Sequence, residues 1–313
     1  MTSAKVSFTR CPDYNSDNVR KSLLRHFELL GPLGNFVSFG DTVLIKPNLI
    51  APRSCDCPAQ THPAVIIELA KILIEAGAKP FVADSPAWAD AQTCAAAIGL
   101  IEPLKKLGVK IEQLDSPVTT RLKSGTKVGI SSKALDADKI INLPKLKAHQ
   151  QLGATIAVKN MFGCISGKAK AIWHFRKGGQ TEDFCKMLIE IYELLAPAIT
   201  IIDAVVAMEG PGPIRGTARD VGCIVASTDP LAAERLCCQL IGFNPHQLPI
   251  LQTAAHLGLG PGDMEKVEVL GDDYHDCILS DFLAAQQVPL RFSLPRILKS
   301  ISRQILLVAK SKN

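Results

Sequence analysis

A lysine-rich stretch contains most of the residues whose types and spacing could do chemistry. Residues 139–181 include eight Lys or Arg and no Asp or Glu. The whole chain has a net charge of +5, so removing these eight charges leaves −3 for the rest. A local surplus of one sign is typical of a site for the opposite charge, whereas solvated charged faces usually mix both signs. The sequence therefore predicts a site for an anion in this basic stretch (residues 139–181).

A small anion fits the basic stretch better than a nucleic acid does. The stretch is poor in the aromatic residues on which bases stack, and the chain has no recognisable nucleic-acid-binding module. We therefore expect a phosphate- or carboxylate-bearing metabolite as ligand, and no nucleic-acid partner.

Two lysines and a histidine alternate where a predicted strand ends. In an extended chain alternate side chains share one side, so Lys145, Lys147 and His149 are expected to face one way. Three such groups together are costly unless an anion or an acid joins them. An exposed loop is the alternative, but the neighbouring polar residues favour a ligand site. These neighbours are Asn142, Lys159 and Asn160.

Two glycine-rich segments resemble nucleotide-binding loops only in part. Residues 163–168 are one residue short of a phosphate-loop motif, and Ala169 replaces the hydroxyl that would hold magnesium. Backbone amides near Gly163 could still cradle an anion. In the second loop, which contains Gly212, two prolines remove the amides that a dinucleotide would need.

Three residues could move protons in this site. His174 has apolar neighbours inside the basic stretch, where cations would keep the imidazole neutral, although such histidines often have only a structural role. Asp203 is the single acid of a predicted buried strand, and Glu209 precedes the stiff Gly-Pro loop. We predict these three residues as the catalytic candidates.

The elements that must position these residues alternate between strand and helix. This alternation predicts an α/β fold, with a mostly parallel sheet, helices on both faces and two closely packed halves. Apolar runs predict strands at 42–46, 80–84, about 109–114, 138–142, 199–208 and 222–227, and a hairpin within 121–130. Helices are predicted over 63–77, about 92–107, 182–195 and 229–241.

The predicted organisation is an α/β region over residues 1–270, with halves of about 1–135 and 136–270. An extension follows over 271–313 and ends in a basic amphipathic helix near 290–310. Such a helix can pack on its own domain, contact a membrane surface or dock on a partner.

Many of the polar residues follow predicted strands. In open α/β sheets, ligands bind outside the carboxyl ends of the strands. We therefore expect one shared site built by Lys46, Asn48, Asp84, Asn142, Lys145, Lys147, Glu209 and Asp229.

The ten cysteines are scattered, and no C-x-x-C motif occurs. This pattern favours reduced thiols over a zinc ribbon or a ferredoxin-type cluster. Cys55 and Cys57 form only a weak metal candidate, and no cofactor is assigned. The amino terminus lacks a secretory signal, and no apolar run approaches the roughly 20 residues of a membrane span, so we expect a cytoplasmic protein.

Several of these motifs together are similar to those of the domain of unknown function 362 family. The resemblance covers residues 40–260 approximately. It rests on Ile45-Lys46-Pro47-Asn48, Thr61-His62-Pro63, Asp84, the run from Ile141 to His149, Lys159-Asn160-Met161-Phe162-Gly163, His174, Asp203, Glu209-Gly210-Pro211-Gly212-Pro213 and Asp229. Many members of that family carry a carboxyl-terminal ferredoxin module, which this sequence lacks. The resemblance therefore implies a site location more than a chemistry.

The leading hypothesis is an enzyme that acts on a small anionic metabolite. The alternative is a redox or iron–sulfur accessory protein that works with a separate ferredoxin-like partner. A non-catalytic anion or nucleic-acid binder is a third, less favoured reading.

Overall fold

A large, mostly parallel sheet organises the chain. The computed structural model describes residues 3–87, 89–166 and 168–290. The main strand order is β12-β1-β11-β10-β7-β2-β3-β4, and β11 runs antiparallel to both of its neighbours. The strands are β1 (Ala4–Arg10), β2 (Thr42–Pro47), β3 (Lys79–Asp84), β4 (Ile111–Gln113), β7 (Lys139–Leu143), β10 (Ile199–Glu209), β11 (Thr217–Ser227) and β12 (Val267–Gly271).

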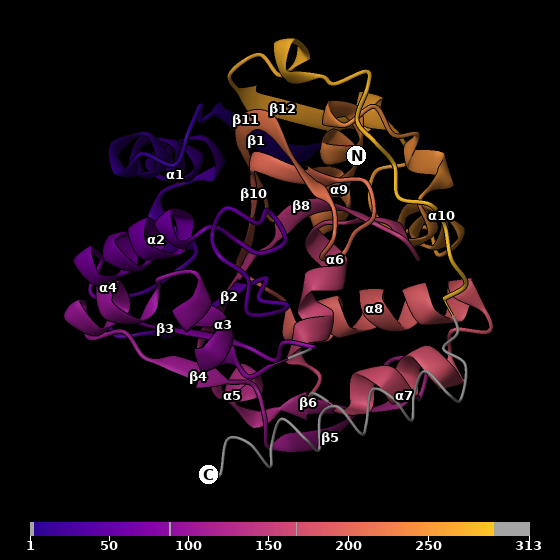
Figure 1. Ribbon diagram of the computed structural model, residues 1–313, viewed down its shortest axis with the longest axis horizontal. Helices are drawn as coiled ribbons and strands as arrows, with labels where there is room; N and C mark the ends of the chain where they lie inside the picture. Colours follow the sequence, from indigo (N-terminus) through magenta and orange to yellow (C-terminus); the bar gives the residue numbers. More distant parts are fainter. Residues whose placement is uncertain (1–2, 88, 167, 291–313) are drawn as a thin grey trace.

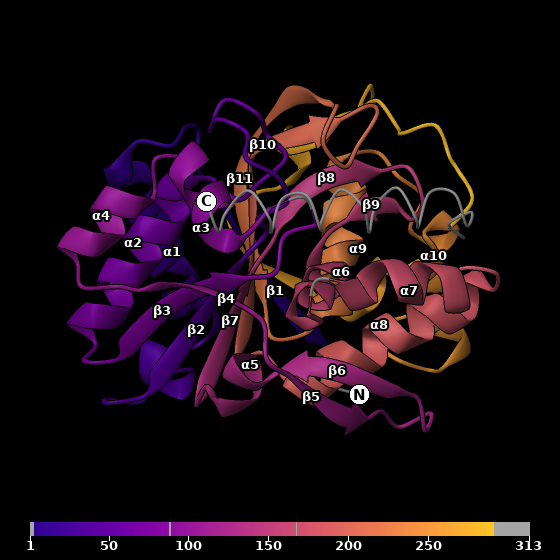
Figure 2. The same ribbon diagram turned by 60° about the horizontal axis from the view of Figure 1, so that its bottom comes forward.

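Helices cover both faces of this sheet, as the α/β prediction requires (Figures 1 and 2). One side holds α1 (Ser16–Leu30), α2 (Pro63–Glu75), α3 (Ala91–Ala97) and α4 (Ile101–Lys106). The other side holds α6 (Ala157–Asn160), α7 (Lys168–Arg176), α8 (Thr181–Leu195), α9 (Pro230–Leu240) and α10 (Pro249–His256). Alternate residues of β2 face the two sides: Val43 and Ile45 join one apolar core, and Leu44 joins the other.

Most predicted elements are present, and local signals explain their boundaries. Pro63 begins α2 and Pro230 begins α9, each after a side chain that caps the helix. The predicted helix over 92–107 is instead two short helices, because Gly99 adopts a φ of 71° that ends the first one.

A second pair of strands lies at the end of β7. Beyond Pro144 the chain continues as β8 (Lys145–His149), which pairs in parallel with β10 and antiparallel with β9 (Gly153–Thr155). The long β10 can therefore pair first with β7 and then with β8. Leu146 and Ala148 belong to an apolar core. The alternating residues Lys145, Lys147 and His149 accordingly share the opposite side of the strand.

The first strand of the chain lies between β11 and β12, so one sheet runs through both predicted halves. The remaining elements are the hairpin β5 (Pro117–Arg121) and β6 (Lys127–Ser131), the helix α5 (Ser132–Asp136) and the 3-10 turns Leu33–Asn35, Met161–Cys164, Pro245–Gln247, Met264–Lys266 and His275–Cys277. Within the described ranges, no helix has the length and apolar character that crossing a membrane requires. The predicted basic helix near 290–310 falls almost entirely outside the described residues.

Candidate functional site

A buried ion pair joins the ends of two neighbouring strands. The Nζ of Lys46, in β2, lies 2.7 Å from Oδ1 of Asp84, the last residue of β3. Both side chains are almost completely buried. Asp84 also accepts hydrogen bonds from the backbone amides of Leu49 and Ser85, each at 2.8 Å. These donors stabilise the charged carboxylate, which in turn compensates the buried charge of Lys46.

Gly163 packs directly on this ion pair. A Cβ atom at this position would overlap Nζ of Lys46 and Oδ1 of Asp84. The φ of Gly163 is not in the left-handed region, so it is space and not backbone conformation that favours glycine here. The absent side chain allows the turn Met161–Cys164 to cover the pair.

Asn160 connects α6 to the strand ends through its side-chain amide. Its Oδ1 accepts hydrogen bonds from Nζ of Lys46 (3.3 Å) and Nδ2 of Asn48 (3.1 Å). Its Nδ2 donates to the carbonyl of Lys46 (3.1 Å) and to Oδ1 of Asn142 (2.8 Å). Asn142 in turn donates to the Ala157 carbonyl and to Thr200. The hydrogen-bonding capacity of both amides is used within the chain.

A second buried ion pair fixes the start of β8. Nζ of Lys145 lies 2.9 Å from Oδ2 of Asp203, beside an irregularity of β10. The Tyr14 hydroxyl donates to Oδ1 of Asp203 at 2.9 Å and lies 2.5 Å from the Lys145 ammonium. The ring of His62 stacks on Tyr14, and its backbone amide donates to Asp203. Burial and the nearby carboxylate raise the pKa of Tyr14 well above its ordinary value, so the phenol keeps its proton.

Lys147 is buried without a carboxylate partner. Its Nζ donates to Oδ1 of Asn48 (2.6 Å) and to the carbonyl of Ala59 (2.7 Å). Its side chain is among the largest that are fully buried. Burial lowers the pKa of Lys147 well below its usual range, and the charge of Lys159 lowers it further.

Two further lysines extend this positive region. Lys159, in α6, is half-buried, and burial together with the charge of Lys170 lowers its pKa to about 8. Lys170, in α7, donates to the carbonyl of Ser85, and burial lowers its pKa to about 8 as well. We call Lys147, Lys159 and Lys170 the lysine cluster.

Two histidines lie near the lysine cluster. The Nδ1 of His149 accepts a hydrogen bond from the backbone amide of Gln151 at 3.1 Å. Burial and the charges of Lys159 and Lys147 lower the pKa of His149 well below its ordinary value, so the ring is neutral with its proton on Nε2. The ring of His174 packs against Phe162 and Phe184.

Positive charge is in excess at this edge of the sheet. Asp84 pairs with Lys46 and Asp203 pairs with Lys145. In the described parts of the chain, no residue of the lysine cluster has an ion-pair partner. Each of these three amines, when protonated, therefore lacks a directly bound counter-charge in the described chain.

Comparison with known proteins shows to which family this chain belongs. Residues 43–239 match the family described as domain of unknown function (DUF362). The chain belongs to this family. A thylakoid-associated protein of Synechocystis sp. is 37% identical over 296 residues, which are 94% of this chain and 92% of that protein.

Solved structures with a similar arrangement are more distant. The lactate racemase apoprotein from Thermoanaerobacterium thermosaccharolyticum aligns over 76% of this chain and 56% of its own, with a TM-score of 0.48 and 15% identity. A protein from Thermotoga maritima aligns over 74% and 59%, with a TM-score of 0.47 and 11% identity. This DUF362 chain thus spans less than two thirds of either structure.

Three predicted site residues of the DUF362 chain lie apart from the lysine cluster or have other partners. Glu209 accepts a hydrogen bond from the backbone amide of Leu283. Gly212 packs so closely on the carbonyl of Ala148 that a Cβ atom would overlap it. That Asp229 shares the strand-end site stays a prediction. Asp229 follows the antiparallel strand β11 and caps α9 by accepting from the amides of Leu231 and Ala232.

Sequence reasoning missed Tyr14, His62 and Lys170 as members of the site. His62 belongs to a motif that supports the family resemblance but to which no site role was assigned, and Lys170 is part of the basic stretch. Tyr14 carried no local signal, because 131 residues separate it from Lys145.

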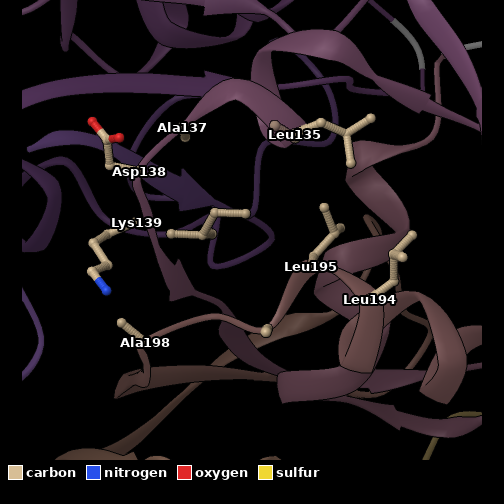
Figure 3. A pocket seen from close by; sticks show the side chains of 10 residues that line it. Leu135, Ala137, Asp138, Lys139, Leu194, Leu195 and Ala198 are labelled. Atoms are coloured by element: carbon tan, nitrogen blue, oxygen red, sulfur yellow. The ribbon is translucent and has the colours of Figure 1, made fainter.

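The metal candidate and a surface hollow lie outside this arrangement. Cys55 is exposed, and the Sγ of Cys57 contacts the carbonyl of Ile214. Within the described ranges, no three His, Cys, Asp or Glu side chains group as metal ligands would. A hollow of about 190 Å³ lies at the start of β7, with Asp138 and Lys139 on one side and leucines on the other (Figure 3). It is at the opposite end of β7 from Asn142.

Proposed function

We propose that this protein binds a small phosphate- or carboxylate-bearing metabolite at the lysine cluster and acts on it as an enzyme. The observation that carries the proposal is the grouping of three lysines, the fully buried Lys147 and the half-buried Lys159 and Lys170, without an ion-pair partner in the described chain. Such an arrangement costs free energy in the absence of a ligand. An anion would offset this cost through charge-assisted hydrogen bonds.

The surrounding residues support distinct roles in this proposal. The pairs Lys46–Asp84 and Lys145–Asp203 are internally compensated, so they form the frame of the site and leave the lysine cluster to meet the ligand. Asn142 and Asn160 position α6, since their amides are already engaged within the chain.

The neutral imidazole of His149 provides a proton-transfer group of the proposed enzyme. His149 carries a proton on Nε2 that it can donate, and it lies within the electrostatic influence of Lys147 and Lys159. Asp203 is less suited to this role, because its oxygens accept from Lys145, Tyr14 and the amide of His62.

Calorimetric titration with inorganic phosphate, citrate and acetate tests the binding step. We expect binding of phosphate or citrate to wild type, and an affinity at least about tenfold lower for Lys170→Gln, because one charge-assisted hydrogen bond of about 1.5–3 kcal/mol is lost. Lys139→Gln is the matched control, because this lysine belongs to the basic stretch but lies at the hollow. Equal affinities for wild type and Lys170→Gln would refute the proposal.

A further inference from the structure

Lys159 differs from the other two lysines of the cluster in its hydrogen bonding. Lys147 donates to Asn48 and to the Ala59 carbonyl, and Lys170 donates to the Ser85 carbonyl. The side chain of Lys159 has no hydrogen bond or ion pair to any residue that the structure describes. Its amine is therefore the one in the cluster whose N–H groups do not donate to an acceptor in the described chain.

The backbone that carries Lys159 is held on both sides. The preceding residue, Val158, donates its amide to the buried carboxylate of Glu234 at 2.8 Å. The following residue, Asn160, makes four hydrogen bonds to the strand ends. An unengaged amine on a fixed backbone meets the positional requirement of a nucleophile.

We propose that Lys159 is a nucleophile that forms an imine with the carbonyl carbon of an anionic substrate, while Lys147 and Lys170 bind the anionic group of that substrate. The proposal deepens the proposed function, on which it rests, by naming the substrate class as carbonyl-bearing anions, such as 2-oxo acids or phosphorylated aldehydes.

The step balances without an oxidant or a reductant. The Nζ lone pair of neutral Lys159 forms a bond to the carbonyl carbon, and the carbonyl oxygen takes up a proton as its π bond breaks. In all, the nitrogen gives up two protons and the oxygen takes up two, so the C–O bond breaks, the oxygen leaves as water and the C=N bond forms. His149, with its proton on Nε2, can donate a hydrogen bond to the departing oxygen, and its ring stays neutral throughout.

The surroundings of Lys159 increase the fraction of its amine that is neutral. Burial and the charge of Lys170 lower the pKa of Lys159 to about 8. At pH 7.5 its neutral fraction is then on the order of 100-fold larger than that of a lysine with an ordinary pKa near 10.4. Lysines next to another cation are known to be activated as nucleophiles for this reason.

Reductive trapping tests the proposal. Pyridoxal 5′-phosphate, which has an aldehyde and a phosphate, and pyruvate, which has a ketone and a carboxylate, are each incubated with the full chain and cyanoborohydride. Peptide mass mapping then locates the adducts. We expect at least one probe to label Lys159 about tenfold faster than Lys139, since the larger neutral fraction outweighs the lower basicity. Inorganic phosphate should slow this labelling.

Two results separate this proposal from the proposed function. Lys159→Arg keeps the positive charge, so it should still bind phosphate in the calorimeter while losing the mapped adduct. If wild type binds phosphate but neither probe labels Lys159 faster than Lys139, the imine proposal is overturned and the anion site stands. If wild type binds no anion, the proposed function fails. The peptide map of wild-type adducts tests the imine proposal even if Lys159→Arg does not fold.

Discussion

The ammonium of Lys46 and the carboxylate of Asp84 lie 2.7 Å apart at the ends of β2 and β3, with both side chains almost fully buried. Asn160 bonds to Lys46 from one direction, and Gly163 packs on both partners. The turn that follows Lys159 is thus built on this ion pair, and the geometry of the lysine cluster depends on it.

Removal of the Asp84 charge should be strongly destabilising. In Asp84→Asn the Lys46 ammonium stays buried without its counter-charge, and two backbone amides lose a charged acceptor. We expect a loss of about 3–5 kcal/mol in the free energy of unfolding. Urea denaturation at pH 7 measures this loss. A change within about 0.5 kcal/mol would show that the pair does not support the fold.

A methyl group at position 163 should disturb the same pair. Gly163→Ala places a Cβ atom on the Lys46 and Asp84 side chains, and we expect a destabilisation of about 1–3 kcal/mol, as for other overpacked interiors. Gly34→Ala is the control, because nothing lies within 4 Å of its added Cβ. Thermal melts compare the two variants. A similar melting temperature for both would contradict the packing described for Gly163.

The buried Glu234 should give the protein a measurable pH dependence. Burial raises its pKa from an ordinary 4.5 to about 7, so the folded state holds this proton longer than the unfolded state. Its contribution therefore makes stability fall as pH rises from 4.5 to 7, and the full cost is present above pH 7.

Glu234→Gln removes this titration and keeps an acceptor for the Val158 amide. Relative to wild type, the variant should gain stability between pH 5 and pH 8 by on the order of 3 kcal/mol, at about 1.4 kcal/mol for each pKa unit. Denaturation curves at both pH values measure the difference. If the two proteins differ in free energy of unfolding by the same amount at pH 5 and pH 8, the pKa of Glu234 is not raised.

Local sequence signals were sufficient to predict the elements that end in the site. The apolar runs that stop at Lys46 and Asp84, and the Pro starts of α2 and α9, located those strands and helices. The same signals could not give strand direction. They did not indicate that β11 is antiparallel to both of its neighbours.

The pairing of charges was not predictable either. Lys145 was expected to meet the ligand, but Asp203 and Tyr14 reach it from 58 and 131 residues away in the chain. The surplus of charge in the basic stretch was visible in the sequence, whereas which lysines stay without a counter-charge depends on these long-range contacts.

Anion affinity should fall as the solution becomes alkaline. The pKa values of Lys159 and Lys170 are lowered to about 8, so both lose their charge in the free protein as pH rises through 8. Sulfate keeps its own charge over this range and is therefore the suitable probe. Between pH 8 and pH 10 its affinity should drop by up to about tenfold per pH unit for each lysine that must be recharged. A constant affinity over this range would contradict these lowered pKa values.

The thermal stability of Lys159→Met, with and without phosphate, tests the lysine cluster most directly. Because pH 7 lies below the lowered pKa of Lys159, the side chain is charged and its full cost to folding stability is present. Without phosphate the variant should be more stable than wild type by about 1–3 kcal/mol, because repulsion from Lys147 and Lys170 is removed. With phosphate it should gain less stability than wild type does. A variant that is no more stable than wild type and shows the same phosphate-induced shift would contradict the proposed anion site.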